Sequence, residues 1–253
     1  MKKEKFAVFL DIDGTLLADG IVPESNIEAI KKVREQGSYV FINTARSHAY
    51  IPQVLRENVP LDGVVAGIGT DLRLGEKRLV SEIMSANELK MTMDYFMGDR
   101  REIAFEGEDV ILWMNPTERR GAEHFIHSPN DFDTVYKDVR ISKMYVRGQL
   151  TKEEYSLFGK KNVVYQHEDY AEFVPKGFGK AAGMKIMIKY LGIPLERCIA
   201  MGDSANDEDM LKAAGISVAM GNAIPEIKEI CTYVSCDAAD GGVAQALHRF
   251  VLN

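Results

Sequence analysis

Two carboxylates stand at the end of an apolar run near the N-terminus. Residues 6–10 have the composition of a buried strand, and Asp11 and Asp13 follow it directly. Burying unpaired carboxylates is strongly unfavourable, so something must compensate their charge, and a metal ion is the natural agent. In open α/β sheets, ligands bind outside the carboxyl ends of the strands. The pair therefore predicts a binding or catalytic site at that edge.

Three other segments place polar residues where a strand ends or a helix begins. Thr44 follows a second apolar strand at 39–43, and Lys180 opens a helix at 179–191. The segment 202–207, Gly-Asp-Ser-Ala-Asn-Asp, follows an apolar strand at 198–201. In a doubly wound sheet these segments would converge with Asp11 on one edge.

The elements around these segments alternate between strand and helix signals at both ends of the chain. The N-terminal part predicts strands at 6–12, 39–43 and 63–66, with helices at 25–36 and 47–57. We expect Ser25 or Asn26 to cap the first of these helices. The C-terminal part predicts helices at 179–191, 206–213, 224–230 and 241–250, with strands at 198–201, 217–220 and 233–235. This order indicates a parallel, doubly wound sheet.

The middle of the chain has a different pattern. A hairpin is expected around 74–77, with strands at 102–106, 109–114, 140–147 and 162–167 and helices at 86–97 and 151–158. This favours an antiparallel sheet with helices on one face. The predicted fold class is α/β: a Rossmann-like core formed by 1–80 and 176–253, with an α+β domain inserted at 81–175.

Composition excludes several classes of protein. The 253 residues carry a formal charge of −7, which argues against a nucleic-acid binder. We find no apolar run long enough to span a membrane and no signal peptide, so we expect a cytoplasmic protein. The three cysteines, Cys198, Cys231 and Cys236, do not form a disulfide framework and are expected to be reduced thiols. The sequence does not indicate an oligomeric state.

Together, the four segments resemble the motifs of the haloacid dehalogenase (HAD) superfamily of aspartate-nucleophile phosphohydrolases. The resemblance covers nearly the whole chain and is greatest to the Cof-like branch, whose members carry a large α/β cap between the second and third motifs. It implies that the core is catalytic and that the insert at 81–175 is a cap that determines substrate specificity.

The resemblance also implies a role for each motif residue. Asp11 would be the nucleophile that attacks phosphorus and forms an aspartyl-phosphate. Asp13 would be the general acid/base that protonates the leaving alcohol and then activates water. Side chains at i and i+2 of a regular strand share a face, so both acids would lie on one side of the phosphoryl group if strand geometry persists to Asp13.

The implied cofactor is Mg²⁺, which prefers hard oxygen ligands. Asp11, Asp203 and the backbone carbonyl of Asp13 would be ligands, while Asn206 and Asp207 would contact these ligands or reach the ion through water. The expected metal residues are Asp11, Asp13, Asp203 and Asp207, and the expected phosphate-binding residues are Thr44, Ala45, Arg46, Lys180 and Asn206.

Simpler interpretations exist for single motifs. Thr44 alone could be a strand-end hydroxyl, Lys180 a surface lysine, and Asp203 with Asp207 the cap of a helix. A calcium loop at Asp11 is excluded because Gly14 comes too early and Leu16 and Leu17 follow it. The chain also departs from the branch pattern, with Ala45 in place of a glycine and Ile68-Gly69-Thr70 in place of Asn-Gly-Ala.

The predicted function is a Mg²⁺-dependent phosphatase that hydrolyses small phosphorylated metabolites, with sugar phosphates as the expected substrates. The alternatives are a phosphosugar mutase and a non-catalytic phosphometabolite-binding protein. Polar or aromatic cap residues are candidates for substrate contact: Trp113, Asn115, Arg119, Arg120, His124, His127, Lys143, Arg147, Glu172 and Lys176.

Overall fold

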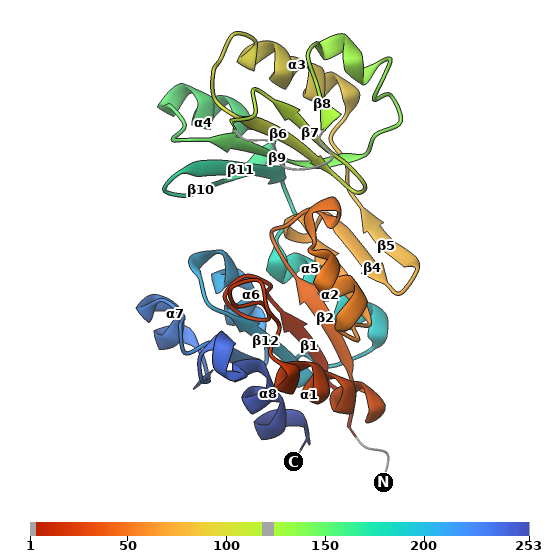
Figure 1. Ribbon diagram of the computed structural model, residues 1–253, viewed down its shortest axis with the longest axis vertical. Coiled ribbons are helices and arrows are strands. Elements are labelled where there is room, and N and C mark those ends of the chain that lie inside the picture. The colour runs from red at the N-terminus through yellow and green to blue at the C-terminus, as the bar shows by residue number, and fades with distance from the viewer. Residues whose placement is uncertain (1–3, 118–123, 253) are drawn as a thin grey trace. The chain divides into compact units, whose positions relative to one another are not determined.

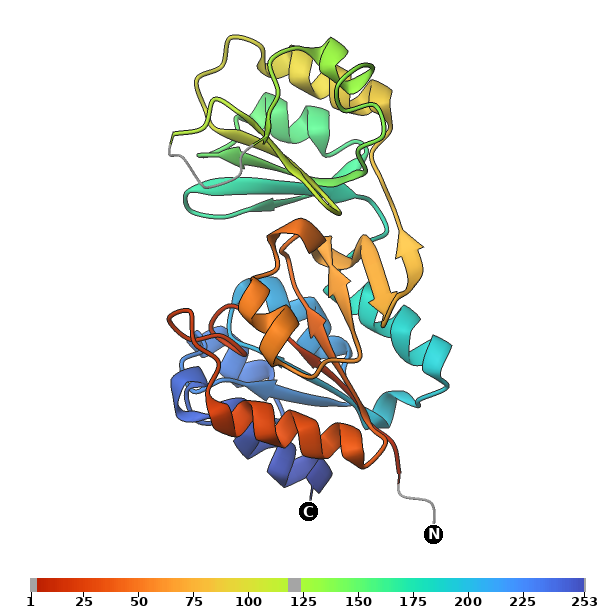
Figure 2. The same cartoon turned by 45° about the vertical axis from the view of Figure 1, so that its right-hand side comes forward.

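The computed structural model describes residues 4–117 and 124–252, which form two compact units (Figures 1 and 2). Unit 1 contains the chain up to Ala45, Ile51–Leu79 and the chain from Gly179 onward. Unit 2 contains Arg46–Tyr50 and Val80–Phe178. No helix within the described ranges is long and apolar enough to cross a membrane.

Unit 1 is built on a sheet with the strand order β14-β13-β12-β1-β2-β3-β4-β5. The parallel strands are β1 (Ala7–Leu10), β2 (Tyr39–Asn43), β3 (Gly63–Ala66), β12 (Cys198–Gly202), β13 (Ile216–Ala219) and β14 (Tyr233–Val234). A hairpin of β4 (Asp71–Leu74) and β5 (Lys77–Ser81) extends the sheet, with β4 antiparallel to β3. The predicted α/β class with a Rossmann-like parallel core is confirmed.

Helices cover both faces of this sheet, so its central strands β1, β2 and β12 are buried and apolar (Figure 2). On one face lie α1 (Glu24–Glu35), α2 (Gln53–Asn58) and α8 (Gly242–Leu247), whose apolar residues join those of β1 and β2 in one core. Against β2, β3, β12 and β13 pack α5 (Lys180–Leu191), α6 (Glu208–Ala213) and α7 (Pro225–Ile230).

Two local predictions for unit 1 were wrong. The first helix is capped by Pro23, not by Ser25 or Asn26. The helix expected at 47–57 is instead a 3₁₀ turn (His48–Tyr50) followed by α2 after Pro52, because proline disfavours a helical residue before it. The helix expected at 241–250 is present as an α-helix up to Leu247, and it is followed by a single π-helical turn.

Unit 2 contains a second sheet with the order β10-β11-β9-β6-β7-β8. Its strands are β6 (Ile103–Gly107), β7 (Ile111–Met114), β8 (His124–Phe125), β9 (Ile141–Arg147), β10 (Asn162–Gln166) and β11 (Tyr170–Pro175), all antiparallel to their neighbours except the pair β7–β8. The helices α3 (Ala86–Phe96) and α4 (Lys152–Phe158) bury apolar side chains against one face. The strands β8 and β11 were not predicted.

Candidate active site

The two acidic segments meet because their strands are neighbours. β1 pairs in parallel with β12, with Leu10 opposite Met201, and Asp11 and Asp203 come directly after these strands. The backbone N–H of Asp11 donates to the carbonyl of Met201 at 3.1 Å, which extends the pairing by one residue. The carboxyl edge of the sheet therefore brings the two carboxylates together, as expected.

Asp13 does not continue the strand. β1 ends at Leu10, and the chain turns so that the carbonyl of Ile12 accepts hydrogen bonds from Leu16 and Leu17. The condition under which Asp11 and Asp13 would share a strand face, strand geometry as far as Asp13, is therefore not met. Asp13 is exposed, and its charge contributes to raising the pKa of Asp203, so it lies beside the acidic cluster.

Gly14 makes this turn possible. Its φ is +74°, a conformation that glycine adopts without steric cost. A Cβ at this position would lie 2.4 Å from Oδ2 of Asp203, so any side chain would clash with that carboxylate. The hydroxyl of Thr15 lies 3.4 Å from Oδ1 of Asp203. The turn after β1 thus fits closely over the acid that follows β12.

Lys180 is placed by close contact between two backbone segments. Gly69 has a φ of +87°, and a Cβ at this position would lie 2.4 Å from the carbonyl oxygen of Gly179. The absence of a side chain at Gly69 therefore allows the two segments to approach. The amide of Asn43, at the end of β2, donates to the carbonyl of Lys180 at 3.0 Å. The first residue of α5 is therefore held against the ends of β2 and β3.

The ammonium of Lys180 lies at the centre of the cluster. It is 1% exposed and donates to Oδ1 of Asp11 at 2.7 Å and to Oδ1 of Asp207 at 2.6 Å. Burial alone would lower the pKa of Lys180, but the two carboxylates more than offset burial and raise it above its usual value. The lysine is therefore charged and buried, and is not the surface residue that its sequence position alone would suggest.

Asp207 and Asn206 organise the loop after β12. Asp207 is fully buried, and its Oδ2 accepts the backbone N–H groups of Asp203 and Ser204 at 3.0 and 3.2 Å. The Oδ1 of Asn206 accepts from Lys180 at 3.3 Å and from the hydroxyl of Ser204 at 3.0 Å. Both oxygens of Asp207 are thus engaged in holding Asp203 and Lys180.

The cluster has the donors that a hard divalent cation requires. Asp11, Asp203 and Asp207 each offer an oxygen, and these oxygens lie within 4.8 Å of one another. Burial and the neighbouring charge of Asp207 raise the pKa of Asp11 to about 7, although Lys180 opposes the shift. The same two causes raise the pKa of Asp203 to about 6. Three carboxylates against one ammonium leave excess negative charge, and an all-oxygen set fits Mg²⁺.

Thr44 and Ala45 lie at the end of the neighbouring strand β2. Thr44 is buried, its N–H donates to the carbonyl of Val65 at 2.9 Å, and its carbonyl accepts from Ile68 at 3.1 Å. Arg46 belongs to unit 2, where its guanidinium lies 4.9 Å from the ring centre of Tyr50 and donates to that residue's carbonyl.

Two asparagines of the site were not identified from the sequence. The amide of Asn222 donates to the carbonyl of Gly14 at 2.8 Å, and its Oδ1 accepts the N–H of Ala238 at 2.8 Å. Asn43 is fully buried and holds Lys180. Both residues stand at or just after an apolar strand, which is the signal that identified Thr44 and Asp203 and could have identified them too.

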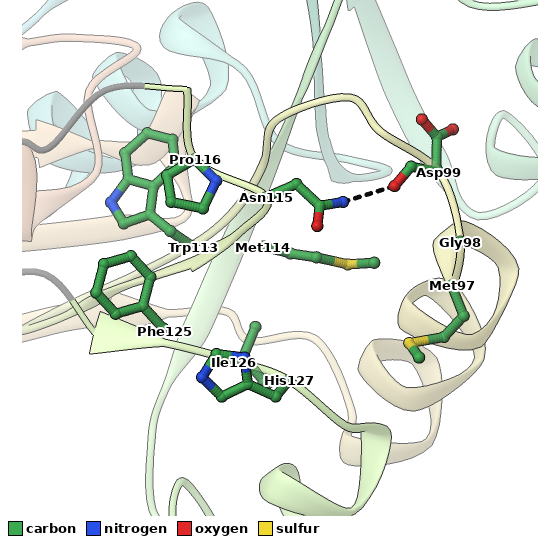
Figure 3. Close-up of a pocket in the computed structure, with 10 residues that line it drawn as sticks. All are labelled: Met97, Gly98, Asp99, Trp113, Met114, Asn115, Pro116, Phe125, Ile126 and His127. Carbon is green, nitrogen blue, oxygen red and sulfur yellow. Dashed lines mark hydrogen bonds between the residues drawn. The ribbon is translucent and has the colours of Figure 1, made fainter.

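The predicted cap contacts are dispersed over unit 2. Trp113, Asn115 and His127 help to line a cavity of about 190 Å³ at the β7–β8 side of the sheet, where the amide of Asn115 donates to the carbonyl of Asp99 (Figure 3). His124 lies in β8. Lys143 and Glu172 form an ion pair, Arg147 donates to Thr117, and Lys176 is exposed. Arg119 and Arg120 lie outside the described residues.

A parallel sheet that brings acids from two adjacent strand ends onto one buried lysine is the arrangement of a haloacid dehalogenase-like hydrolase. The chain belongs to this family: the model for haloacid dehalogenase-like hydrolases matches residues 8–247. The family identification made from the motifs is therefore confirmed, and the protein is an enzyme of this hydrolase class.

Individual relatives are phosphatases of similar length. The 5-amino-6-(5-phospho-D-ribitylamino)uracil phosphatase YcsE of Bacillus subtilis is 27% identical over 97% of this chain and 95% of its own. The phosphatase YwtE of the same organism, with the same named substrate, is 26% identical over 96% and 97% of the two chains. The solved structure of the HAD subclass IIB sugar phosphatase BT4131 superposes with a TM-score of 0.82, at 25% identity, over 97% of this chain and 99% of that one.

Proposed function

We propose that this protein is a Mg²⁺-dependent phosphatase that hydrolyses small phosphorylated metabolites through an aspartyl-phosphate on Asp11. The observation that carries the proposal is the contact of the Lys180 ammonium with Asp11 and Asp207, within a cluster that also contains Asp203. A non-catalytic binding protein would not need to retain a buried nucleophile beside an exposed acid, Asp13.

The chemistry would proceed in two displacements. The carboxylate of Asp11, oriented by the hydrogen bond from Lys180, attacks phosphorus while Asp13 donates a proton to the leaving alcohol. Asp13 then takes a proton from a water molecule that attacks the aspartyl-phosphate, which releases inorganic phosphate and restores Asp11. The exposure of Asp13 allows it to exchange protons with substrate and solvent.

Charge compensation supports the first step. Asp11, Asp203 and the backbone carbonyl of Asp13 would hold Mg²⁺, with Asp207 fixing the loop of Asp203. When bound there, Mg²⁺ supplies positive charge that shields the nucleophile from the phosphate dianion. Lys180 adds a fixed charge, while the hydroxyl of Thr44 and the N–H of Ala45 would bind phosphoryl oxygens together with Asn206. The contact of Arg46 with Tyr50 argues for a lesser role of Arg46.

The proposed substrates are sugar or sugar-alcohol phosphates, selected by unit 2. Two relatives act on a phosphorylated ribitylamino compound and a structural neighbour is a sugar phosphatase, so polyhydroxylated leaving groups recur among proteins similar to this chain.

The central test compares Asp11→Asn with Asp19→Asn, using release of phosphate from 4-nitrophenyl phosphate in Mg²⁺. Asp11→Asn removes the nucleophilic oxygen and should abolish activity, whereas Asp19 is exposed and should be replaceable. Full activity of Asp11→Asn would exclude the aspartyl-phosphate mechanism. Transfer of phosphate within a sugar bisphosphate, without release to water, would instead indicate the mutase.

A further inference from the structure

Asn43 is a polar residue at the end of an apolar strand. The preceding residues of β2, Val40–Ile42, lie in the core, and Asn43 is as completely buried as they are. Burying an amide costs free energy unless its nitrogen and its oxygen both find hydrogen-bond partners. The partners of this amide therefore indicate what an asparagine contributes at this position.

The amide nitrogen of Asn43 lies between two acceptors. It donates to the carbonyl oxygen of Lys180 at 3.0 Å and to the sulfur of Met210 at 2.9 Å. Because both neighbours are acceptors, the amide is oriented with its nitrogen toward them. Asn43 thus joins the end of β2 to the first residue of α5 and to a buried side chain of α6.

The amide oxygen of Asn43 is less well satisfied than the nitrogen. It is buried and receives no hydrogen bond from the described residues. Leaving a buried acceptor without a donor costs at least as much free energy as one neutral hydrogen bond contributes. An apolar side chain would avoid that cost, so the stability of the fold does not by itself account for an asparagine here.

The carbonyl of Lys180 does not depend on Asn43 for a donor. α5 begins at Lys180, and in an α-helix each carbonyl accepts from the N–H group four residues later. The amide of Asn43 is therefore a second donor to an oxygen that has two lone pairs. What the bond adds is a fixed position for the backbone from which the lysine side chain extends.

The start of α5 is held by side chains from neighbouring elements. Gly179 precedes the helix and has no side chain that could cap it. The N–H of Ala181 donates instead to Oδ2 of Asp209, a residue of α6, at 3.2 Å. Together with Asn43, this contact fixes the first turn of α5 from outside the helix.

The position of that turn determines where the ammonium of Lys180 lies. Asp11 follows β1 directly and Asp207 is held in the loop after β12, so the positions of both acids are set by the sheet. The ammonium meets them at 2.7 and 2.6 Å. Because Lys180 is 1% exposed, its side chain has little freedom to compensate for a shift of its backbone.

We propose that Asn43 is a positioning residue of the active site, which holds the carbonyl of Lys180 and thereby keeps the ammonium within hydrogen-bond distance of Asp11. This rests on the proposed phosphatase function. The effect of Asn43 on the rate passes through Lys180, so it requires the ammonium.

The test is a double-mutant cycle that combines Asn43→Leu with Lys180→Met. Leucine keeps the branched shape of asparagine but has no N–H donor, and Asn43→Ala is the second variant if leucine is not accommodated. The maximal rate of phosphate release from 4-nitrophenyl phosphate in Mg²⁺ is measured, in single turnovers with enzyme in excess where the rate is low.

Asn43→Leu should lower this rate by about tenfold when Lys180 is present, because misplacing a catalytic group by about 1 Å can cost about 10²-fold. In the Lys180→Met background the same substitution should lower the rate by no more than about twofold, which is the usual scatter for independent changes.

The matched control is Asn26→Leu. Asn26 is also fully buried in unit 1, but it lies in α1, on the other face of the sheet from α5 (Figure 2). Its oxygen accepts the N–H of Ala244 at 2.9 Å, and its nitrogen donates to none of the described residues. This substitution removes an equally buried hydrogen bond, so any change in rate should be the same with and without the ammonium of Lys180.

A loss of rate in Asn43→Leu that persists at full size in the Lys180→Met background would overturn the proposal, since Asn43 would then act through another neighbour such as Thr44. An unchanged rate in both Asn43→Leu and Asn43→Ala would overturn it as well. In either case the phosphatase function stands. Failure of the wild-type enzyme to hydrolyse 4-nitrophenyl phosphate would overturn both.

Discussion

Replacing Lys180 by methionine removes the positive charge at the centre of the site and so tests what that charge contributes to stability and activity. Methionine keeps an unbranched apolar stem of similar length, so packing at the start of α5 changes little. The ammonium that holds Asp11 at 2.7 Å and Asp207 at 2.6 Å is lost. Both carboxylates remain buried, with Asp203 beside them.

The size of the effect follows from this geometry. Removing one partner of a buried ion pair costs about 3–5 kcal/mol, because a buried charge is left uncompensated. In a chain of this size, 1 kcal/mol shifts the unfolding temperature by about 2–4 °C, so the expected decrease is about 6–20 °C. Without Lys180, the pKa of Asp11 rises further in the folded state, because the lysine opposes the upward shift caused by burial. A raised folded pKa gives stability that is present at low pH and lost as the pH rises, so the deficit should be larger at pH 8 than at pH 5.

The assay is thermal unfolding followed by circular dichroism in the presence of a chelator, together with phosphate release in Mg²⁺. Lys185→Met, an exposed lysine of the same helix, is the matched control and should change stability by about 0.5 kcal/mol or less. Loss of the pre-placed charge should also reduce kcat by about 10²-fold or more. If Lys180→Met were as stable and as active as Lys185→Met at pH 8, the argument from buried charge would be wrong.

Two further predictions concern the same edge of the sheet. In the metal-free wild-type protein, the pKa values of Asp11 (about 7) and Asp203 (about 6) exceed the usual 3.8, so stability should fall as the pH rises from 5 to 8. Mg²⁺ stabilises the ionised carboxylates and should remove most of that fall in unfolding temperature; a fall that persists in saturating Mg²⁺ would contradict the assigned cluster. Asn222→Ala removes hydrogen bonds to Gly14 and Ala238 and should cost about 1–3 kcal/mol in urea unfolding and lower kcat by loosening the turn. Unchanged unfolding and kcat would show that this asparagine does not support the site.

Much of the site was predictable because its signals are local. An apolar run ending in acids predicts both a buried strand and its functional edge, and this local signal identifies Asp11 and Asp203 without the information that their strands are neighbours. Their roles in catalysis and metal binding remain predictions. The strand period does not extend to Asp13, because β1 ends at Leu10 and the chain enters a turn that depends on the positive φ of Gly14.

Other features depend on contacts that no local pattern contains. Asparagine is a residue type that often caps helices, but the side chain of Asn26 accepts a hydrogen bond from the backbone N–H of Ala244, which is far along the chain. Tyr170–Pro175 forms β11 although it contains Glu172, whose charge is compensated by Lys143 on the adjacent strand. Sequence period alone cannot foresee such partners.

The contact between Gly69 and Gly179 has a consequence for how this enzyme could diversify. The chain leaves unit 1 after Leu79, beyond the first glycine, and returns to it at the second, so the segments on both sides of the inserted domain meet at one point beside Lys180. Closing a longer loop costs only slightly more entropy than closing a shorter one. The intervening domain could therefore be enlarged, shortened or exchanged while the lysine stays in register with its carboxylates. New substrates could be acquired by replacing that domain, without re-evolving the catalytic residues.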